Sequence, residues 1–150
     1  MNQRMRTWGT ILAIITAVAI SHGFSKELSL EQLKAKLQNA KPDDRATLSV
    51  RVAEMQVENA DKLYSAGKSE EALAAIHEVV SYSEQAQQAA EQTGHRLKNV
   101  EIAVRRMARR LTGIKRGLAF DDQAGVQEAV ERLDKIDSDL LKRMFGKNPK

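Results

Sequence analysis

The most concentrated chemical feature of the sequence is a group of four arginines, Arg105, Arg106, Arg109 and Arg110. From residue 95 to residue 118 there are eight basic residues and one acidic residue, Glu101. Guanidinium groups bind phosphate and carboxylate oxygens, so this arginine stripe could hold a phosphate-rich polymer or the head groups of anionic lipids. The stripe contains no aromatic side chain that could stack on bases, and we therefore expect no nucleic acid as a partner.

The same arginines also fit a structural role. Residues 119–141 contain seven acidic and two basic side chains. A basic helix followed by an acidic helix is what an antiparallel pair with complementary flanks would show. The sequence therefore leaves two explanations open, which are pairing within the chain and binding of a polyanion or an anionic membrane surface.

Few residues offer catalytic or metal-binding chemistry. His77 and His95 lack the spacing of a two-histidine zinc site, and acidic residues at helical spacing such as Asp134 and Asp137 usually form a solvated face. No strand pattern precedes the segment 113–117, so its two glycines do not form a phosphate loop. The chain has no cysteine, which excludes disulfides and thiolate metal sites. No nucleophile has a base beside it in a recognisable motif, and we expect no catalytic residue, no metal, no cofactor and no enzyme activity.

Five helical segments are expected to position these side chains. Most of the common residues are good helix formers, and apolar residues recur at steps of three and four. Ser29 and Gln32 form a capping-box pattern, Ser69 is expected to cap the third helix, and Asp121 or Asp122 the fifth. The sequence thus predicts an all-α fold, a bundle of about five mostly antiparallel helices. The expected helices cover about residues 29–40, 44–66, 70–93, 97–118 and 122–145.

The second and fourth helices have the widest apolar surfaces. The fourth helix repeats apolar residues at alternating steps of three and four, which is a heptad seam. Packing inside the bundle explains most of this surface, but a helix that is apolar over a wide arc can also contact a partner or a second copy. The possible partner contacts on this seam are Leu97, Val104, Met107 and Leu111.

The first 23 residues have the pattern of a secretory signal peptide. Arg4 and Arg6 precede an apolar run that is shorter than the about 20 residues of a membrane-spanning helix, and small residues follow it. We expect cleavage of residues 1–23 and a periplasmic or secreted protein; an uncleaved membrane anchor over residues 7–23 is the alternative. Residues 24–146 would then form a single helical domain, followed by a frayed tail at residues 147–150, and residues 24–150 together carry 22 basic and 20 acidic side chains.

One hairpin in the sequence resembles a known repeat. The matching residues are Ala60, Leu63, Tyr64, Gly67, Glu70, Glu71, Ala72, Leu73 and Ile76. On these residues, the segment 45–80 resembles a single tetratricopeptide-type helical hairpin, which implies that Gly67 makes the turn and Ala60 permits close helix contact. The usual tryptophan and the closing proline are missing, and no second copy of the repeat is present. The run from Arg45 to Ala75 also resembles uncharacterised helical domains of exported bacterial proteins, which implies a fold and a compartment but no chemistry.

These features together predict a class of function. We expect a non-enzymatic, exported helical bundle that acts as a protein-interaction or self-assembly module in the cell envelope. The alternative is an envelope-associated module that binds anionic lipid or polymer through the arginine stripe.

Overall fold

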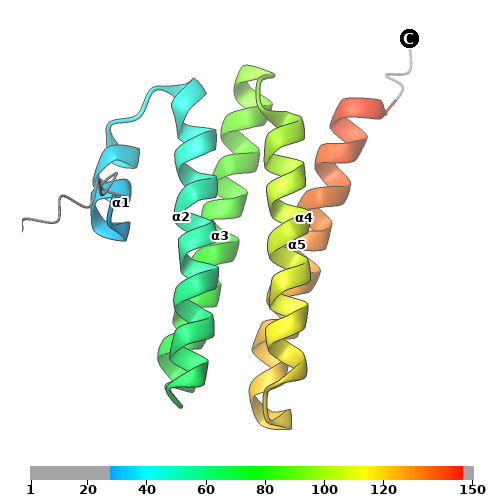
Figure 1. Cartoon of the computed structure of the whole chain (residues 1–150). Coiled ribbons are helices and arrows are strands. Elements are labelled where there is room, and N and C mark those ends of the chain that lie inside the picture. Colours follow the sequence, from blue (N-terminus) through cyan, green and yellow to red (C-terminus); the bar gives the residue numbers. More distant parts are fainter. Residues whose placement is uncertain (1–27, 147–150) are drawn as a thin grey trace, which may run out of the picture.

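The described part of the chain consists of five helices (Figure 1). A computed structural model describes residues 28–146, so the expectations for the signal segment and the tail at 147–150 lie outside the described residues. No strand occurs in this range, and the all-α class with five helices is confirmed. The helices are α1 (Leu30–Gln38), α2 (Pro42–Ser65), α3 (Ser69–Thr93), α4 (Leu97–Arg116) and α5 (Phe120–Phe145).

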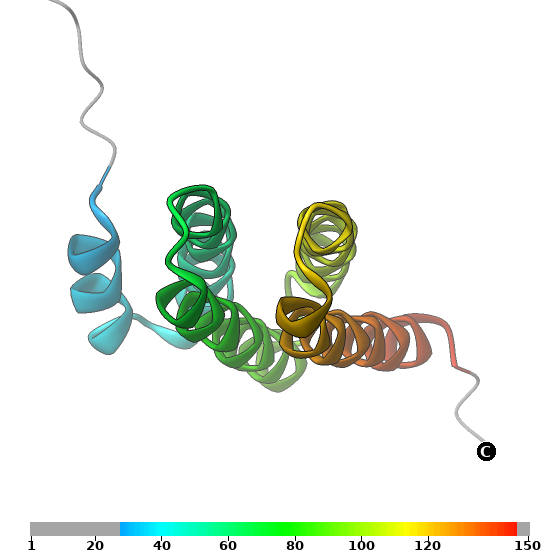
Figure 2. The same ribbon diagram turned by 90° about the horizontal axis from the view of Figure 1, so that it is seen from below.

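The helices α2 to α5 form two hairpins that pack side by side. α2 contacts α3 along its length, α4 contacts α5, and the two hairpins meet through α2 with α4 and α3 with α5. In Figure 1, α2 and α4 therefore lie in front of α3 and α5. Figure 2 shows α1 beside the first hairpin, on the side away from α4 and α5. As a result, one side of the α4–α5 hairpin is covered by none of the helices in residues 28–146.

The apolar rows of all four long helices meet in one core. Alanines let the helices approach closely, and larger aliphatic side chains fill the space between them. At Gly125 the α5 backbone lies against Leu73 of α3, because a Cβ atom there would be 2.5 Å from Leu73 Cδ1. The largest side chains that are fully buried in the core include Ile76, Val79, Val100, Val104, Leu111, Val126, Leu133 and Leu140.

The helix ends agree only partly with the predicted caps. The capping box of α1 is confirmed, because the Gln32 N–H donates to Ser29 Oγ and the Ser29 N–H donates to Gln32 Oε1. The predicted cap at Ser69 is wrong: Lys68 precedes α3, and the Ser69 hydroxyl instead bonds to Asp122 at 3.2 Å. The cap at Asp121 or Asp122 is also wrong, because α5 already begins at Phe120, after Ala119. Both aspartates lie in its first turn, where the positive end of the helix dipole favours them.

The short helix α1 is attached to the first hairpin by a small set of contacts. Leu33 and Leu37 are buried, and Lys34 Nζ lies 2.7 Å from Glu78 Oε2 of α3. Partial burial lowers the pKa of Lys34, but the hydrogen bond and the charge of Glu78 outweigh this effect, so the pKa is raised above its ordinary value. The Lys34–Glu78 pair therefore stabilises α1 only while the lysine is charged.

We expect the protein to lose stability at alkaline pH. Folding raises the pKa of Lys34 from 10.5, and burial together with the charge of Asp122 raises the pKa of Tyr64 from 10.0. A group with a raised folded pKa contributes stability below its unfolded pKa and loses that contribution as pH rises through the folded pKa. The free energy of unfolding, measured by denaturant titration, should therefore fall above about pH 10. The Lys34→Gln variant should fall less steeply, and identical pH profiles for the two proteins would contradict this explanation.

Candidate interaction surface

The heptad seam of α4 packs inside the molecule. Val104, Met107 and Leu111 are buried in the core, and Leu97 is partly buried against it. A partner cannot reach the three buried side chains while the bundle is folded. The wide apolar arc of α4 therefore serves packing against α2, α3 and α5.

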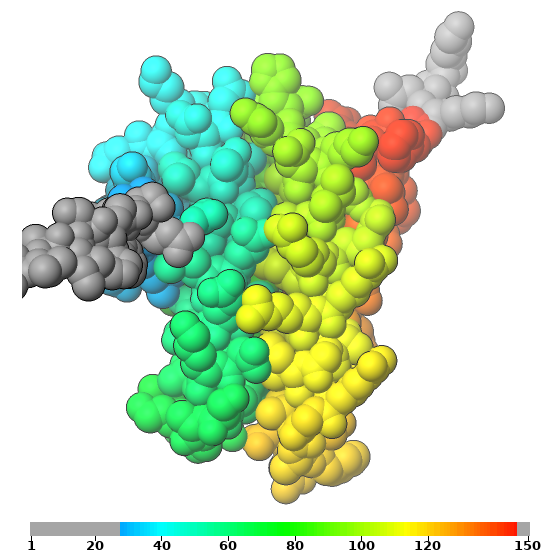
Figure 3. All heavy atoms as spheres, in the orientation of Figure 1, coloured from blue at the N-terminus to red at the C-terminus, as the bar shows by residue number. Residues whose placement is uncertain are grey.

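The arginine stripe is largely paired within the chain, and its main partners come from α2. Arg106 forms an ion pair with Glu54. Arg110 Nη1 lies 3.5 Å from Glu58 Oε1, and Arg110 Nη2 lies 3.8 Å from Asp61 Oδ2. Figure 3 shows the face on which the side chains of α2 and α4 meet. The acidic flank of α5, which the sequence suggested as the partner, therefore does not pair with Arg106 or Arg110.

Arg105 is the member of the stripe that faces α5. It pairs with Glu101 on its own helix, and its Nε lies 3.5 Å from Asp137 Oδ1 of α5. The Glu101 residue is only 4% exposed, so its carboxylate depends on Arg105 for charge compensation. Arg109 has no ion-pair partner among residues 28–146.

The other titratable residues singled out in the sequence do not converge on a site. His77 is exposed on α3, and His95 lies in the α3–α4 turn with Nδ1 3.2 Å from Asp43 Oδ1. Asp134 is exposed on α5. In the described range, no group of histidine and acidic side chains has the arrangement of a metal site. None of the described helices is both long and apolar enough to span a membrane.

The cavities of the described part are open grooves without a catalytic constellation. One of them, of about 640 Å³, lies between α1 and the second half of α3. Its lining combines the amides of Gln85, Gln88 and Gln92 with the ring of Tyr82. Two smaller hollows, of about 210 and 260 Å³, lie between α2 and α4 and are lined by the paired Glu54 and Arg106. Neither type of groove brings a nucleophile and a base together.

The large apolar side chains that remain exposed all come from the α4–α5 hairpin. Within residues 28–146 these are Ile102 at 48%, Phe120 at 87% and Phe145 at 77% exposure. Isolated exposed apolar residues are common, but here every one of them belongs to the same hairpin. None of the three side chains was predicted from the sequence as part of an interaction surface. Ile102 falls outside the three–four steps of the α4 seam, and this break in the pattern was the available signal.

These side chains share one side of the hairpin. On α4, Arg106 and Arg110 contact α2, whereas Arg105 contacts α5. The strip of the α4 surface between these two sets of contacts is exposed to solvent. On α5, the corresponding strip lies on the side away from Gly125, which packs on α3. We call this surface the distal face. Its residues are Lys98, Ile102, Arg109 and Arg116 of α4 and Phe120, Glu131, Asp134 and Phe145 of α5.

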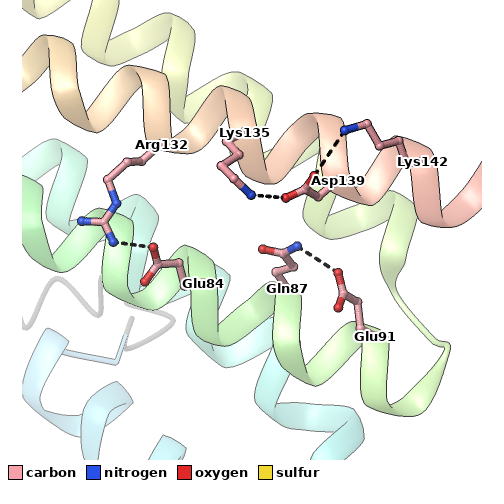
Figure 4. Close-up of polar contacts among 7 residues, drawn as sticks. All are labelled: Glu84, Gln87, Glu91, Arg132, Lys135, Asp139 and Lys142. Carbon is pink, nitrogen blue, oxygen red and sulfur yellow. Dashed lines mark hydrogen bonds and ion pairs between the residues drawn. The ribbon is translucent and has the colours of Figure 1, made fainter.

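Three of the four basic side chains of α5 form ion pairs away from the distal face. Figure 4 shows Arg132 reaching Glu84 of α3, and both Lys135 and Lys142 directed to Asp139. These contacts hold the pKa of Asp139 below its ordinary value, chiefly through the hydrogen bond from Lys135. The acidic side chains of α5 on the distal face, Glu131 and Asp134, are therefore not paired with the basic side chains of the same helix. Glu131 accepts a hydrogen bond from the neutral Gln127, and Asp134 has no ion-pair partner in the described part of the chain.

Comparisons of the chain with protein-family models, with curated proteins and with solved structures find no match. The resemblance of residues 45–80 to a tetratricopeptide-type hairpin therefore stays a prediction. Gly67 does adopt the left-handed conformation, with φ of 74°, in the turn between α2 and α3. The function of the chain therefore has to be argued from its own surface. On the distal face, exposed large apolar side chains occur together with charged side chains that have no ion-pair partner in the described residues.

Proposed function

We propose that the protein is a non-enzymatic interaction module, exported to the cell envelope, which binds a protein chain through the distal face. One observation carries this proposal: the exposed large apolar side chains of residues 28–146 all lie on the α4–α5 hairpin. Large apolar side chains set among charged groups are typical of protein interfaces. The export part of the proposal rests on the signal-like residues 1–23.

The charges of the distal face support a protein partner. Its α4 side has the cations Lys98, Arg109 and Arg116, and its α5 side has the anions Glu131 and Asp134. A surface with both signs matches another protein surface better than it matches a uniformly anionic lipid or polymer. In addition, three of the four arginines of the stripe already have carboxylate partners within the chain. The anionic-ligand alternative therefore gains no support from the geometry of the stripe.

Site-directed photo-crosslinking in the intact envelope tests the proposal. A photo-reactive residue at position 102 should yield a crosslinked protein adduct, because the proposal places Ile102 inside the interface. The same residue at position 62, where Lys62 is exposed on α2, serves as the matched control and should yield none. Equal adduct yields from the two positions, or no adduct from position 102, would contradict the proposal.

A further inference from the structure

We infer that the chain bound at the distal face is a second copy of this protein, related to the first by a two-fold axis parallel to the long helices. This inference rests on the proposed function and adds the identity of the partner. Homodimers with two-fold symmetry use the same patch on both copies, so the patch must be complementary to itself.

The distal face meets this condition through its charges. The α4 half is basic, with Lys98, Arg109 and Arg116 free of ion pairs in the described structure. The α5 half is acidic. Arg132, Lys135 and Lys142 are held by Glu84 and Asp139 on other sides of the helix (Figure 4). Arg143, five turns after Gly125, lies on the side of α5 that faces α3. When two such faces meet, the basic half of each copy can lie opposite the acidic half of the other copy. Each half is then next to charges of the opposite sign.

The contacts between α4 and α5 fix which residues lie at the same height. Arg105 pairs with Asp137 and Lys115 with Gln127, so residue numbers rise along α4 as they fall along α5. By the same register, Arg109 is level with Asp134. An axis parallel to the helices preserves height and places α4 opposite α5 of the second copy. Arg109 of each copy then faces Asp134 of the other, which gives two equivalent ion pairs.

The other orientation of the axis is excluded by charge. A two-fold axis across the helices would place α4 on α4 and bring the unpaired cations of both copies together. Like charges brought together in an interface oppose association. The pattern of charge on the distal face therefore selects one of the two face-to-face arrangements.

The exposed apolar side chains fit the same arrangement. Phe145 is at the end of α5 that lies beside the start of α4, one to two turns from the level of Ile102. In the dimer, Ile102 of one copy therefore lies near Phe145 of the other. Phe120 is at the opposite end of the face, next to Arg116 of the second copy. An apolar contact thus lies at one end of the interface, a contact between an aromatic ring and a cation lies at the other, and the ion pairs lie between them.

Charge reversal tests this dimer with an internal rescue. The protein isolated from the envelope should sediment at twice the mass of one chain. Arg109→Glu and Asp134→Arg should each raise the dimer dissociation constant by at least about tenfold, because each creates two like-charge contacts. An equimolar mixture of the two variants should recover the dimer, since both contacts in the mixed pair become attractive. Lys62→Glu, an equal charge change on exposed α2, should leave the dissociation constant unchanged.

The possible outcomes separate this inference from the proposed function. A wild-type protein that stays monomeric up to about 0.1 mM, where even weak complexes form, would overturn the second-copy inference. If the mixture of variants fails to recover the dimer, the proposed axis is wrong. A crosslink from position 102 to a different protein would retain the proposed function and overturn the homodimer. The absence of any crosslink from that position would overturn both.

Discussion

Replacement of Arg105 by methionine is expected to lower the free energy of unfolding by about 3 kcal/mol. The substitution leaves Glu101, which is only 4% exposed, without its ion-pair partner. Removing one member of a buried pair is costly because the other charge stays in a poorly solvated place. Arg105 is itself partly exposed, which sets the expected loss at the lower end of the usual range. Urea titration of the variant and the wild type measures the difference.

Two controls separate charge burial from loss of packing. Adding Glu101→Gln to the Arg105→Met variant should restore most of the lost stability, because the buried charge is then absent. Arg106→Met, on the same helix, should cost less than about 1 kcal/mol, since Arg106 and Glu54 are both solvent-accessible. If Arg105→Met and Arg106→Met were equally destabilising, burial of Glu101 would not be the cause.

The second large effect is expected at Leu111, which is fully buried in the second half of α4. Leu111→Ala should lower the free energy of unfolding by about 3–4 kcal/mol, through lost burial and the cavity that remains. Ile102→Ala, on the same helix but 48% exposed, should change stability by less than about 0.5 kcal/mol. In contrast, Ile102→Ala should weaken binding at the distal face. A loss of stability at Ile102 as large as that at Leu111 would show that Ile102 is part of the core.

Much of the fold could be predicted from the sequence because the relevant information is local. The three–four spacing of apolar residues in α4 sets both its helical state and its buried side, and Val104 and Leu111 are fully buried as this spacing requires. Gly67 and Gly94 mark the ends of α2 and α3 because the turn residues there need positive φ. The cap at Ser69 could not be predicted from type alone, because its hydroxyl is bonded to Asp122, 53 positions away.

The partners of the arginines depended on how the hairpins pack. The sequence indicated that a basic and an acidic helix are neighbours, but it did not show that α2 lies on the other side of α4. Arg106 and Arg110 point to that side, where Glu54, Glu58 and Asp61 recur at helical spacing. The distal face was missed for the same reason. Only the lateral order of the helices shows which side of α4 and α5 stays uncovered.

The central claim is that a partner covers the distal face in the envelope. It can be tested directly by cysteine labelling, because the chain has no cysteine of its own. A single cysteine replaces Ile102, and its rate of alkylation by a water-soluble maleimide is compared between the intact envelope and the dilute purified protein. A cysteine in place of Lys62 reports general accessibility. We predict that alkylation at position 102 is slowed at least about tenfold in the envelope, as expected for a side chain inside an interface, while position 62 reacts equally in both states. Equal rates at position 102 in the two states would contradict the claim that the distal face binds a partner.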